Sequence, residues 1–255
     1  MCLNSPADTS NTAGTATFTS RTVERRSAVG VLADRMKDLL ANRDFSDVQF
    51  VVGVQFGPEK IFPAHKSILC SSSGVFYNMI CNSVAETCSL IIHFPDIPSD
   101  AFASLLSYVY TDSVENINAD NVFPTLQCAD KFAMPFLADT CCAFIIQHVN
   151  ADNCLTMLEN AIRWSPDRDS IPEKCLEIVE ASGDTILQSE LFSSIGHDSL
   201  QMILQRSSLS ADENTVYLAV EKWAGKACEK RNLGPSAANR REVLGAALFL
   251  VRFPL

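Results

Sequence analysis

The segment from residue 44 to residue 80 constrains the fold more tightly than any other part of this chain. Its first stretch alternates in character, which predicts a β-strand with one buried face made by Val48, Phe50 and Val52. A connection with two glycines, residues 53–60, leads into a second short strand at residues 61–62. We expect Pro63 to end that strand, because proline has no N–H to give to a sheet. The pattern predicts a β-hairpin.

Two short helices are expected next, at residues 65–70 and 75–80, with the serine- and glycine-rich residues 71–74 between them. A third strand is predicted at residues 89–94. Beyond it, an apolar stripe at helical spacing predicts a longer helix, with Phe102, Leu105, Leu106 and Val109 on its inner face. A small sheet with clustered helices, an α+β domain, is therefore expected.

Three motifs lie in this part of the chain: Phe-Ser-Asp-Val at residues 45–48, Ala-His-Lys at residues 64–66 and Ser-x-x-Phe at residues 73–76. In this order and spacing they resemble the opening of a BTB/POZ domain. The resemblance implies a dimerising platform without catalytic activity of its own. Many members of that family deliver substrates to cullin-3 ubiquitin ligases.

Residues 1–28 offer few large apolar side chains, so we expect a disordered tail before a BTB/POZ domain over residues 29–150. From residue 31 the pattern changes to an amphipathic helix whose apolar stripe contains Leu32, Met36, Leu39 and Leu40. The resemblance implies that this stripe packs across the two-fold axis of a homodimer. Packing of the stripe on the chain's own core is the alternative.

Two charged residues of the motifs, Asp47 and Lys66, lie near the dimer interface in proteins of this family. The resemblance implies a charged pair that helps to organise the cleft of the dimer. The alternative is that Asp47 only tethers local backbone while Lys66 is solvated, since the cost of desolvation leaves a buried ion pair with little net stability. The neighbouring His65 is expected to be a hydrogen-bonded core residue rather than a ligand or a base.

The loop after the second short helix contains Val84, Ala85 and Glu86. Cullin-3 adaptors carry a hydrophobic-x-Glu motif in this loop, and the resemblance implies that Val84 anchors in a cullin pocket while Glu86 fixes the orientation. Helices around residues 152–162 would flank the same face. An ordinary solvated loop is the alternative.

After residue 150 strand patterns all but disappear, and we expect a second, all-α domain over residues 151–255. Its clearest local signal is a capping box at residues 210–213, which opens a helix. Two related tetrapeptides at residues 118–121 and 150–153 predict further helix starts capped by their aspartates. Residues 191–223 resemble a BACK domain, the helical module that follows many BTB/POZ domains.

The segment at residues 248–254 is similar to one in the BTB-BACK-PHR family of cullin-3 adaptors. The resemblance implies that the BACK domain is incomplete at its end and that the PHR domain, which would bind substrate, is absent here. A short chain of this kind could form mixed dimers with related BTB proteins.

Composition excludes several classes of function. A net charge of −10 argues against binding to nucleic acid, and no apolar run is long enough to span a membrane. The ten cysteines lack metal-ligand spacing and favour burial in a reducing compartment, so no metal or cofactor is expected. A thiol sensor at Cys141 and Cys142 would need an exposed thiol of low pKa.

Motifs of catalysis are also missing, and no catalytic residue is expected. Residues 197–199 bring His, Asp and Ser together in sequence, but neighbours in sequence rarely converge as a triad, and Asp198 is expected to cap a helix. The sequence thus predicts a homodimeric, non-enzymatic adaptor in the cytoplasm, with the nucleus as a second location. Its expected partners are the N-terminal domain of cullin-3 and an unknown substrate. A BTB scaffold or transcriptional co-regulator that does not bind cullin is the alternative.

Overall fold

A computed structural model describes residues 31–82, 90–166, 168–234 and 236–251. A sheet of three strands lies in the first half, with strand order β2-β1-β3. Its strands are β1 (Val48–Val52), β2 (Lys60–Ala64) and β3 (Leu90–Phe94). The first two form the predicted antiparallel hairpin, whereas β3 pairs parallel with β1. A parallel pair requires a crossover connection, and the chain between β2 and β3 supplies it.

The centre of the sheet is the core of this half of the molecule. Val48, Phe50 and Val52 are fully buried, as the alternation predicts. The Phe50 ring lies 5.9 Å from the ring centroid of Phe76 and 5.1 Å from that of Phe102. Aromatic pairs at such distances add stability beyond the burial of their area.

The second strand is longer than predicted, because it continues through Pro63 to Ala64. Pro63 lies opposite Gln49 of β1, and β2 is at the edge of the sheet. In an edge strand, half of the N–H groups point to solvent rather than to a neighbouring strand. Proline, which has no N–H, is therefore tolerated there. The expectation that Pro63 ends the strand was wrong for this reason.

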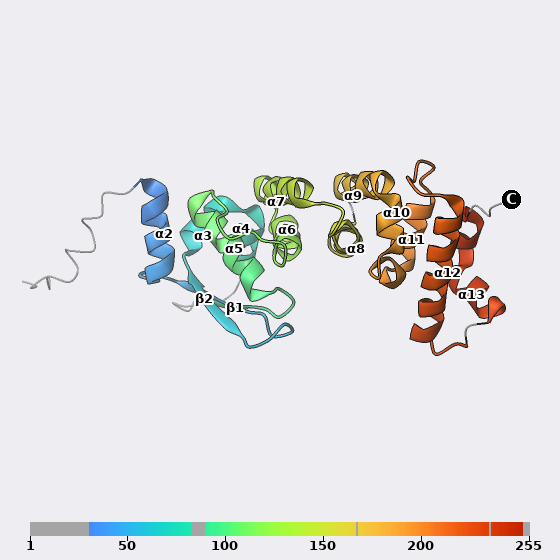
Figure 1. Cartoon of the computed structure of the whole chain (residues 1–255). Coiled ribbons are helices and arrows are strands. Elements are labelled where there is room, and N and C mark those ends of the chain that lie inside the picture. The colour runs from blue at the N-terminus through green and yellow to red at the C-terminus, as the bar shows by residue number, and fades with distance from the viewer. Residues whose placement is uncertain (1–30, 83–89, 167, 235, 252–255) are drawn as a thin grey trace, which may run out of the picture.

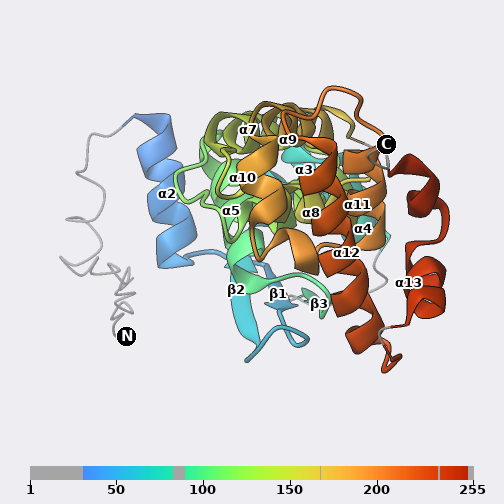
Figure 2. The ribbon, with the colours of Figure 1, turned by 45° about the vertical axis from the view of Figure 1, so that its right-hand side comes forward.

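Six helices of the described residues accompany the sheet: α2 (Leu32–Asn42), α3 (Lys66–Ser72), α4 (Gly74–Cys81), α5 (Ser99–Thr111), α6 (Val122–Lys131) and α7 (Pro135–His148). The strands lie below this cluster of helices in both ribbon views (Figures 1 and 2). Only Ser73 separates α3 from α4, so the predicted break at residues 71–74 was too wide. His148, the last residue of α7, is exposed.

Ser73 fixes the corner between α3 and α4. Its side-chain oxygen accepts the backbone N–H of Val75 at 3.1 Å and that of Phe76 at 3.4 Å, which caps the start of α4. Its hydroxyl donates to the carbonyl of Phe132 at 2.6 Å. One buried side chain therefore caps a helix and ties it to the chain at the end of α6.

The second half is helical throughout its described residues, as predicted. Its elements are α8 (Cys154–Trp164), α9 (Ser170–Ala181), α10 (Gly183–Gln188), the 3₁₀ turn η1 (Phe192–Ser194), α11 (His197–Leu204), α12 (Glu213–Lys230), α13 (Ala237–Leu244) and η2 (Gly245–Leu250). They continue the row of helices away from the sheet, so the molecule is elongated (Figure 1). The buried Trp223 donates its indole N–H to the carbonyl of Ile195 at 2.9 Å.

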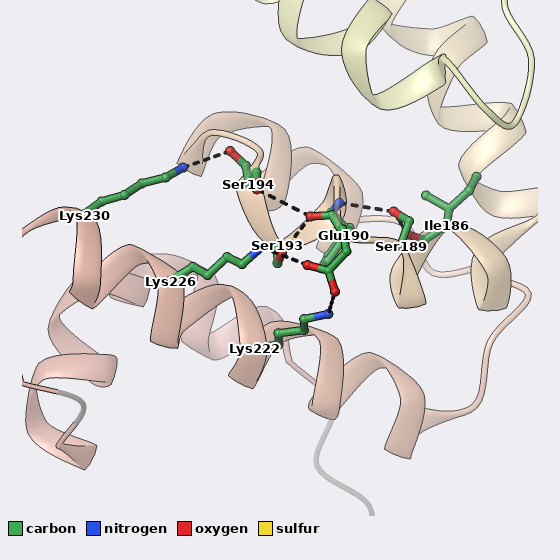
Figure 3. A network of polar contacts seen from close by, with 9 residues as sticks. Ile186, Ser189, Glu190, Ser193, Ser194, Lys222, Lys226 and Lys230 are labelled. Atoms are coloured by element: carbon green, nitrogen blue, oxygen red, sulfur yellow. Dashed lines mark hydrogen bonds and ion pairs between the residues drawn. The ribbon is translucent and has the colours of Figure 1, made fainter.

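Lysines of α12 hold that helix against η1 (Figure 3). Lys222 and Lys226 both reach the carboxylate of Glu190, at 2.5 Å and 3.0 Å, and Lys230 donates to the carbonyl of Ser194 at 3.1 Å. Hydrogen bonds and charge from Lys222 and Lys226 lower the pKa of Glu190 to about 2. Glu190 therefore stays ionised over the physiological range of pH.

Several helix starts use side chains other than those predicted. Asn118 accepts the N–H groups of Asp120 and Asn121, and Asn121 accepts the N–H of Asn118 in return. The same reciprocal arrangement recurs between Asn150 and Asn153. The predicted aspartate caps were wrong, because each asparagine pair already satisfies the N–H groups of its turn.

Two caps in the second half also differ from prediction. Asp212, not Ser210, caps α12, by accepting the N–H of Thr215 at 2.5 Å. Asp198 does not cap α11, because the N-cap residue of that helix is Gly196. The carboxylate of Glu159 on α8 accepts the backbone N–H of Gly196 at 2.9 Å. A carboxylate from a neighbouring helix thus takes the place of a local cap.

Arg168 joins the two halves of the molecule. Its guanidinium donates to the carboxylate of Asp130 on α6 at 2.6 Å and to the sulfur of Cys142 on α7 at 3.6 Å. In the same region α6 packs against α8, and α7 against α9. The two halves are therefore joined both by these hydrogen bonds and by the packing of helices.

Most described cysteines are buried, as predicted: Cys128, Cys141, Cys142, Cys154, Cys175 and Cys228. Burial raises the pKa of Cys128, Cys141 and Cys175 to about 12. These thiols act as small apolar side chains rather than as nucleophiles.

Replacement of the capping residue tests the role assigned to the α3–α4 corner. We expect Ser73→Ala to lower the free energy of unfolding by about 1–2 kcal/mol, because a buried cap and a buried hydrogen bond are both lost. Chemical denaturation followed by circular dichroism measures the change. The matched control is Ser71→Ala on the exposed side of α3, expected to change stability by less than about 0.5 kcal/mol. Equal effects of the two variants would contradict the assignment.

Candidate interaction surface

Helix α2 lies at one end of the molecule, beside the helices that cover the sheet (Figures 1 and 2). It packs on α5, and Lys37 forms an ion pair with Glu115 in the chain that follows α5. None of its residues is buried. Met36, Leu39 and Leu40 are half-buried, whereas Leu32 is exposed. The predicted apolar stripe is therefore present, but this chain covers it only in part.

Further apolar side chains are exposed near the two ends of α2. Val31 and Leu32 are 70% and 62% exposed at its start, and Phe45, just beyond its end, is 85% exposed. Ile61 of β2 is 55% exposed. We call these four residues, with the stripe of α2, the α2 surface. Exposed apolar residues gathered in one region are typical of a surface that binds another protein.

The backbone at Phe45 has an unusual conformation. Its φ angle is 63°, and Arg43 two residues earlier has φ 59°. A bulky residue rarely adopts such a left-handed conformation, and it costs about 1–3 kcal/mol where it occurs. The tight turn between α2 and β1 thus holds an aromatic ring in solvent at an energetic cost.

A pocket of about 360 Å³ opens where α2, β2 and α5 meet. Its walls are apolar apart from two cations, and they comprise Leu40, Arg43, Lys60, Ile61, Phe62, Pro63, Ala103 and Leu106. Because Ile61 and Leu40 belong to this wall, the pocket is continuous with the α2 surface. A complementary apolar side chain of a partner could enter it.

Asp47 and Lys66 interact through backbone rather than as a charged pair. The Asp47 carboxylate accepts the backbone N–H of Lys66 at 2.8 Å, which caps the first turn of α3. The backbone N–H of Asp47 donates to the carbonyl of Ala64 at 3.1 Å. Both side chains are half-buried. This geometry favours the tethering role of Asp47, which was the alternative to an organised pair in a dimer.

His65 is a buried, hydrogen-bonded residue, as expected. Its Nε2–H donates to the carbonyl of Asp44 at 2.7 Å, so its Nδ1 accepts the hydroxyl of Tyr110 at 2.6 Å. The Tyr110 oxygen in turn accepts the backbone N–H of His65 at 3.0 Å. Both ring nitrogens are therefore occupied, which leaves this histidine no free nitrogen for a metal or a substrate.

The residues expected to bind cullin, Val84, Ala85 and Glu86, lie outside the described residues. The helix before them, α4, ends at Cys81.

Neighbouring His and Ser residues at the start of α11 do not form a triad. His197 bonds the carbonyl of Leu244 at 2.9 Å, whereas the Ser199 hydroxyl donates to Glu159. Among the described residues no group of three His, Cys, Asp or Glu side chains could hold a metal ion. In the same part of the chain no helix is long and apolar enough to cross a membrane.

Sequence reasoning missed Phe45, Ile61 and Arg168. Phe45 is part of a quoted motif, but its exposure depends on the left-handed turn, which the sequence does not reveal. Ile61 lies in the expected strand, and only the edge position of β2 leaves it uncovered. Arg168 pairs with a residue 38 positions away, for which no local signal exists.

Two family models match the chain. The model of the BTB/POZ domain matches residues 36–149, and the model described as BTB And C-terminal Kelch, or BACK, matches residues 154–255. The sheet and most of the α2 surface lie in the first match, whereas Val31 and Leu32 precede it. All helices from α8 onward lie in the second match.

Similar curated proteins are longer than this chain. BTB/POZ domain-containing protein 6-B of Danio rerio is 38% identical over 224 residues, which make up 88% of this chain and 45% of that protein. BTB/POZ domain-containing protein 6 of Homo sapiens is 36% identical over 88% of this chain and 40% of its own length. BTB/POZ domain-containing protein 3 of Homo sapiens is 35% identical over 85% of this chain and 41% of its own length. The chain spans less than half the length of these relatives.

The pair of His65 and Tyr110 gives a prediction about stability. We expect Tyr110→Phe to lower the free energy of unfolding by about 1–3 kcal/mol, because the backbone N–H of His65 loses its buried acceptor. Urea denaturation at neutral pH measures the change. Tyr77→Phe, on an exposed tyrosine, is the control and should change stability by less than about 0.5 kcal/mol.

The variant Tyr110→Phe also tests how the stability of the protein depends on pH. Burial raises the pKa of Tyr110 to about 12 from its ordinary 10.0, although the N–H of His65 opposes this. A raised pKa means that the folded state holds the proton more tightly, so this contribution is complete below pH 10 and disappears as pH rises towards 12. The stability difference between wild type and Tyr110→Phe should therefore shrink over that range. A constant difference would contradict the assignment.

Proposed function

Because this chain belongs to the BTB/POZ proteins that carry a BACK domain, we propose that it is a homodimeric adaptor that brings a substrate to a cullin-3 RING ubiquitin ligase. Such proteins are typically adaptors rather than enzymes, and ubiquitin transfer would be carried out by other subunits of the ligase. Bringing a substrate close raises its effective concentration at the site of transfer. The proposed location is the cytoplasm, with the nucleus as a second location.

The observation that carries the dimer proposal is the partly covered α2 surface. No residue of α2 is buried, and Leu32, Phe45 and Ile61 are all more than half exposed. A two-fold dimer buries the same patch on both copies, so one apolar surface on one chain is sufficient to form the interface. The same surface supports mixed dimers with related BTB proteins.

The proposal of cullin binding depends on sequence. Val84 and Glu86 match the hydrophobic-x-Glu motif by type and by position after α4. Helix α8, which would flank the cullin face, packs on α6, and Arg168 ties the two domains together. Because the two domains are in contact, both could bind the same partner, which supports the proposal.

A BTB scaffold or transcriptional co-regulator without cullin binding is the second candidate. The pocket of about 360 Å³ beside Leu40 and Ile61 favours this candidate, because an apolar pocket next to a dimer interface could bind a short peptide. Both candidate functions require a dimer, and they differ in whether that dimer binds cullin.

Charge placed on the α2 surface tests dimerisation. We expect Leu32→Asp and Ile61→Asp to raise the dissociation constant of the dimer at least about tenfold, because a carboxylate would have to be buried among apolar groups. Sedimentation equilibrium of the whole chain measures it. Leu218→Asp is the matched control, because Leu218 is 54% exposed on α12 at the other end of the molecule. A monomeric wild type, or equal effects of Ile61→Asp and Leu218→Asp, would contradict the proposed interface.

Calorimetric titration against the N-terminal domain of cullin-3 tests the adaptor function. We expect a dissociation constant below about 1 μM, weakened about tenfold or more by Val84→Asp and by Glu86→Ala. Glu59→Ala, which removes an exposed carboxylate from the β1–β2 connection, is the control and should bind as wild type does. Failure of a folded dimer to bind would favour the scaffold candidate.

A further inference from the structure

A pocket of about 510 Å³ lies in the helical half of the molecule, where α8, α9 and α11 pack against one another (Figure 1). Most of its wall is apolar and is made by Ala161, Ile162, Pro166, Pro172 and Met202. Pockets of this size with apolar walls are typical of sites that bind small molecules. The few polar groups in the wall decide which kind of molecule would fit.

One of these polar groups is the side chain of Ser165, which follows the last residue of α8 and is 4% exposed. Its backbone N–H donates to the carbonyl of Ala161 at 2.9 Å, and its own carbonyl accepts the N–H of Arg168 at 3.1 Å. Its hydroxyl has no hydrogen-bond partner among the described residues. A buried hydroxyl without a partner destabilises the folded state, so its presence calls for an explanation.

The other buried serines show that this protein ordinarily satisfies such groups. Each of the other four buried serines of the described residues donates a hydrogen bond from its hydroxyl: Ser73, Ser104, Ser193 and Ser199. The exception, Ser165, is the one that lines this pocket. A ligand in the pocket would supply the missing partner.

The charges of the wall are negative. Its described residues include two carboxylates, Asp169 and Glu173, and no Lys or Arg. Glu173 forms an ion pair with Arg206. Asp169 is the N-cap residue of α9 but makes no capping hydrogen bond, and its neighbour Arg168 pairs instead with Asp130. The wall therefore favours a cationic ligand and disfavours an anionic one.

We infer that this pocket binds a small organic cation, an ammonium group on an apolar body. The ammonium group has only donors, so it can donate to the free hydroxyl of Ser165 and to the carboxylate of Asp169. The apolar body lies against Ile162 and Met202. The site is independent of dimerisation and of cullin binding, because its residues belong neither to the α2 surface nor to residues 84–86.

Nuclear magnetic resonance of the whole chain, labelled with ¹³C in its methionine methyl groups, tests the inference. Hexylammonium chloride is the probe, added at constant ionic strength, and the variant Met202→Leu assigns the signal of Met202. We expect a saturable shift of that signal with a dissociation constant of about 1 mM or tighter. The signal of Met36, on α2 at the other end of the molecule, should not shift.

Two probes with the same apolar body separate the contribution of charge. Hexan-1-ol should bind at least about fivefold more weakly than hexylammonium, and hexanoate should give no saturable shift, because the wall is negatively charged. The inference is overturned if hexylammonium leaves the Met202 signal in place, or if hexan-1-ol binds as tightly as hexylammonium.

Variants of the two polar residues separate binding from stability. Ser165→Ala should weaken hexylammonium binding at least about threefold without lowering the midpoint of thermal unfolding, because the lost hydroxyl has no partner in the free protein. Asp169→Asn, at an exposed position, should also weaken hexylammonium binding but leave that of hexan-1-ol unchanged. Asp152→Asn, an exposed carboxylate before the start of α8, is the matched control. Unchanged affinity in both Ser165→Ala and Asp169→Asn would overturn the inference.

Discussion

Burial of β1 between two strands is the constraint on which the first half of the structure depends. Its residues Val48, Phe50 and Val52 are fully buried, and the ring of Phe50 contacts rings from α4, β3 and α5. A central strand of this kind requires neighbours on both sides. The hairpin supplies β2, while β3 can reach the other side only after a crossover, which α3 and α4 provide. The α3–α4 corner and its cap at Ser73 follow from that requirement.

The second half is attached by side chains as well as by packing. Arg168 bonds Asp130 and Cys142 across the junction, where α6 meets α8 and α7 meets α9. Farther along the chain, Glu159 accepts the backbone N–H of Gly196 at the start of α11. The carboxylate of Glu190 accepts hydrogen bonds from Lys222 and Lys226 of α12. Each contact joins helices that are distant in sequence. The helical domain therefore has a fixed arrangement without any sheet in its described residues.

Sequence patterns predicted the elements well where the signal was local. The alternation at β1 and the apolar stripes of α2 and α5 correspond to observed elements, and the order of a BTB/POZ and a BACK domain is confirmed. The predictions were wrong where contacts with distant parts of the chain determine the local structure. The edge position of β2 allowed Pro63 to continue the strand, and Glu159 replaced Asp198 at the start of α11. The candidate surface was foreseen through Leu32, whereas the exposure of Phe45 needed the backbone angle of a turn that has no sequence signature.

The parallel pairing of β1 with β3 has a consequence for how the chain folds. Strands β1 and β2 are close in sequence and can pair early, but β3 joins only after the intervening helices have closed a long loop. Until then the second edge of β1, with its run of apolar residues, stays open to any other extended chain. During synthesis this interval leaves the nascent protein prone to aggregation through the open edge of β1, and it ends when residues 90–94 have left the ribosome and docked.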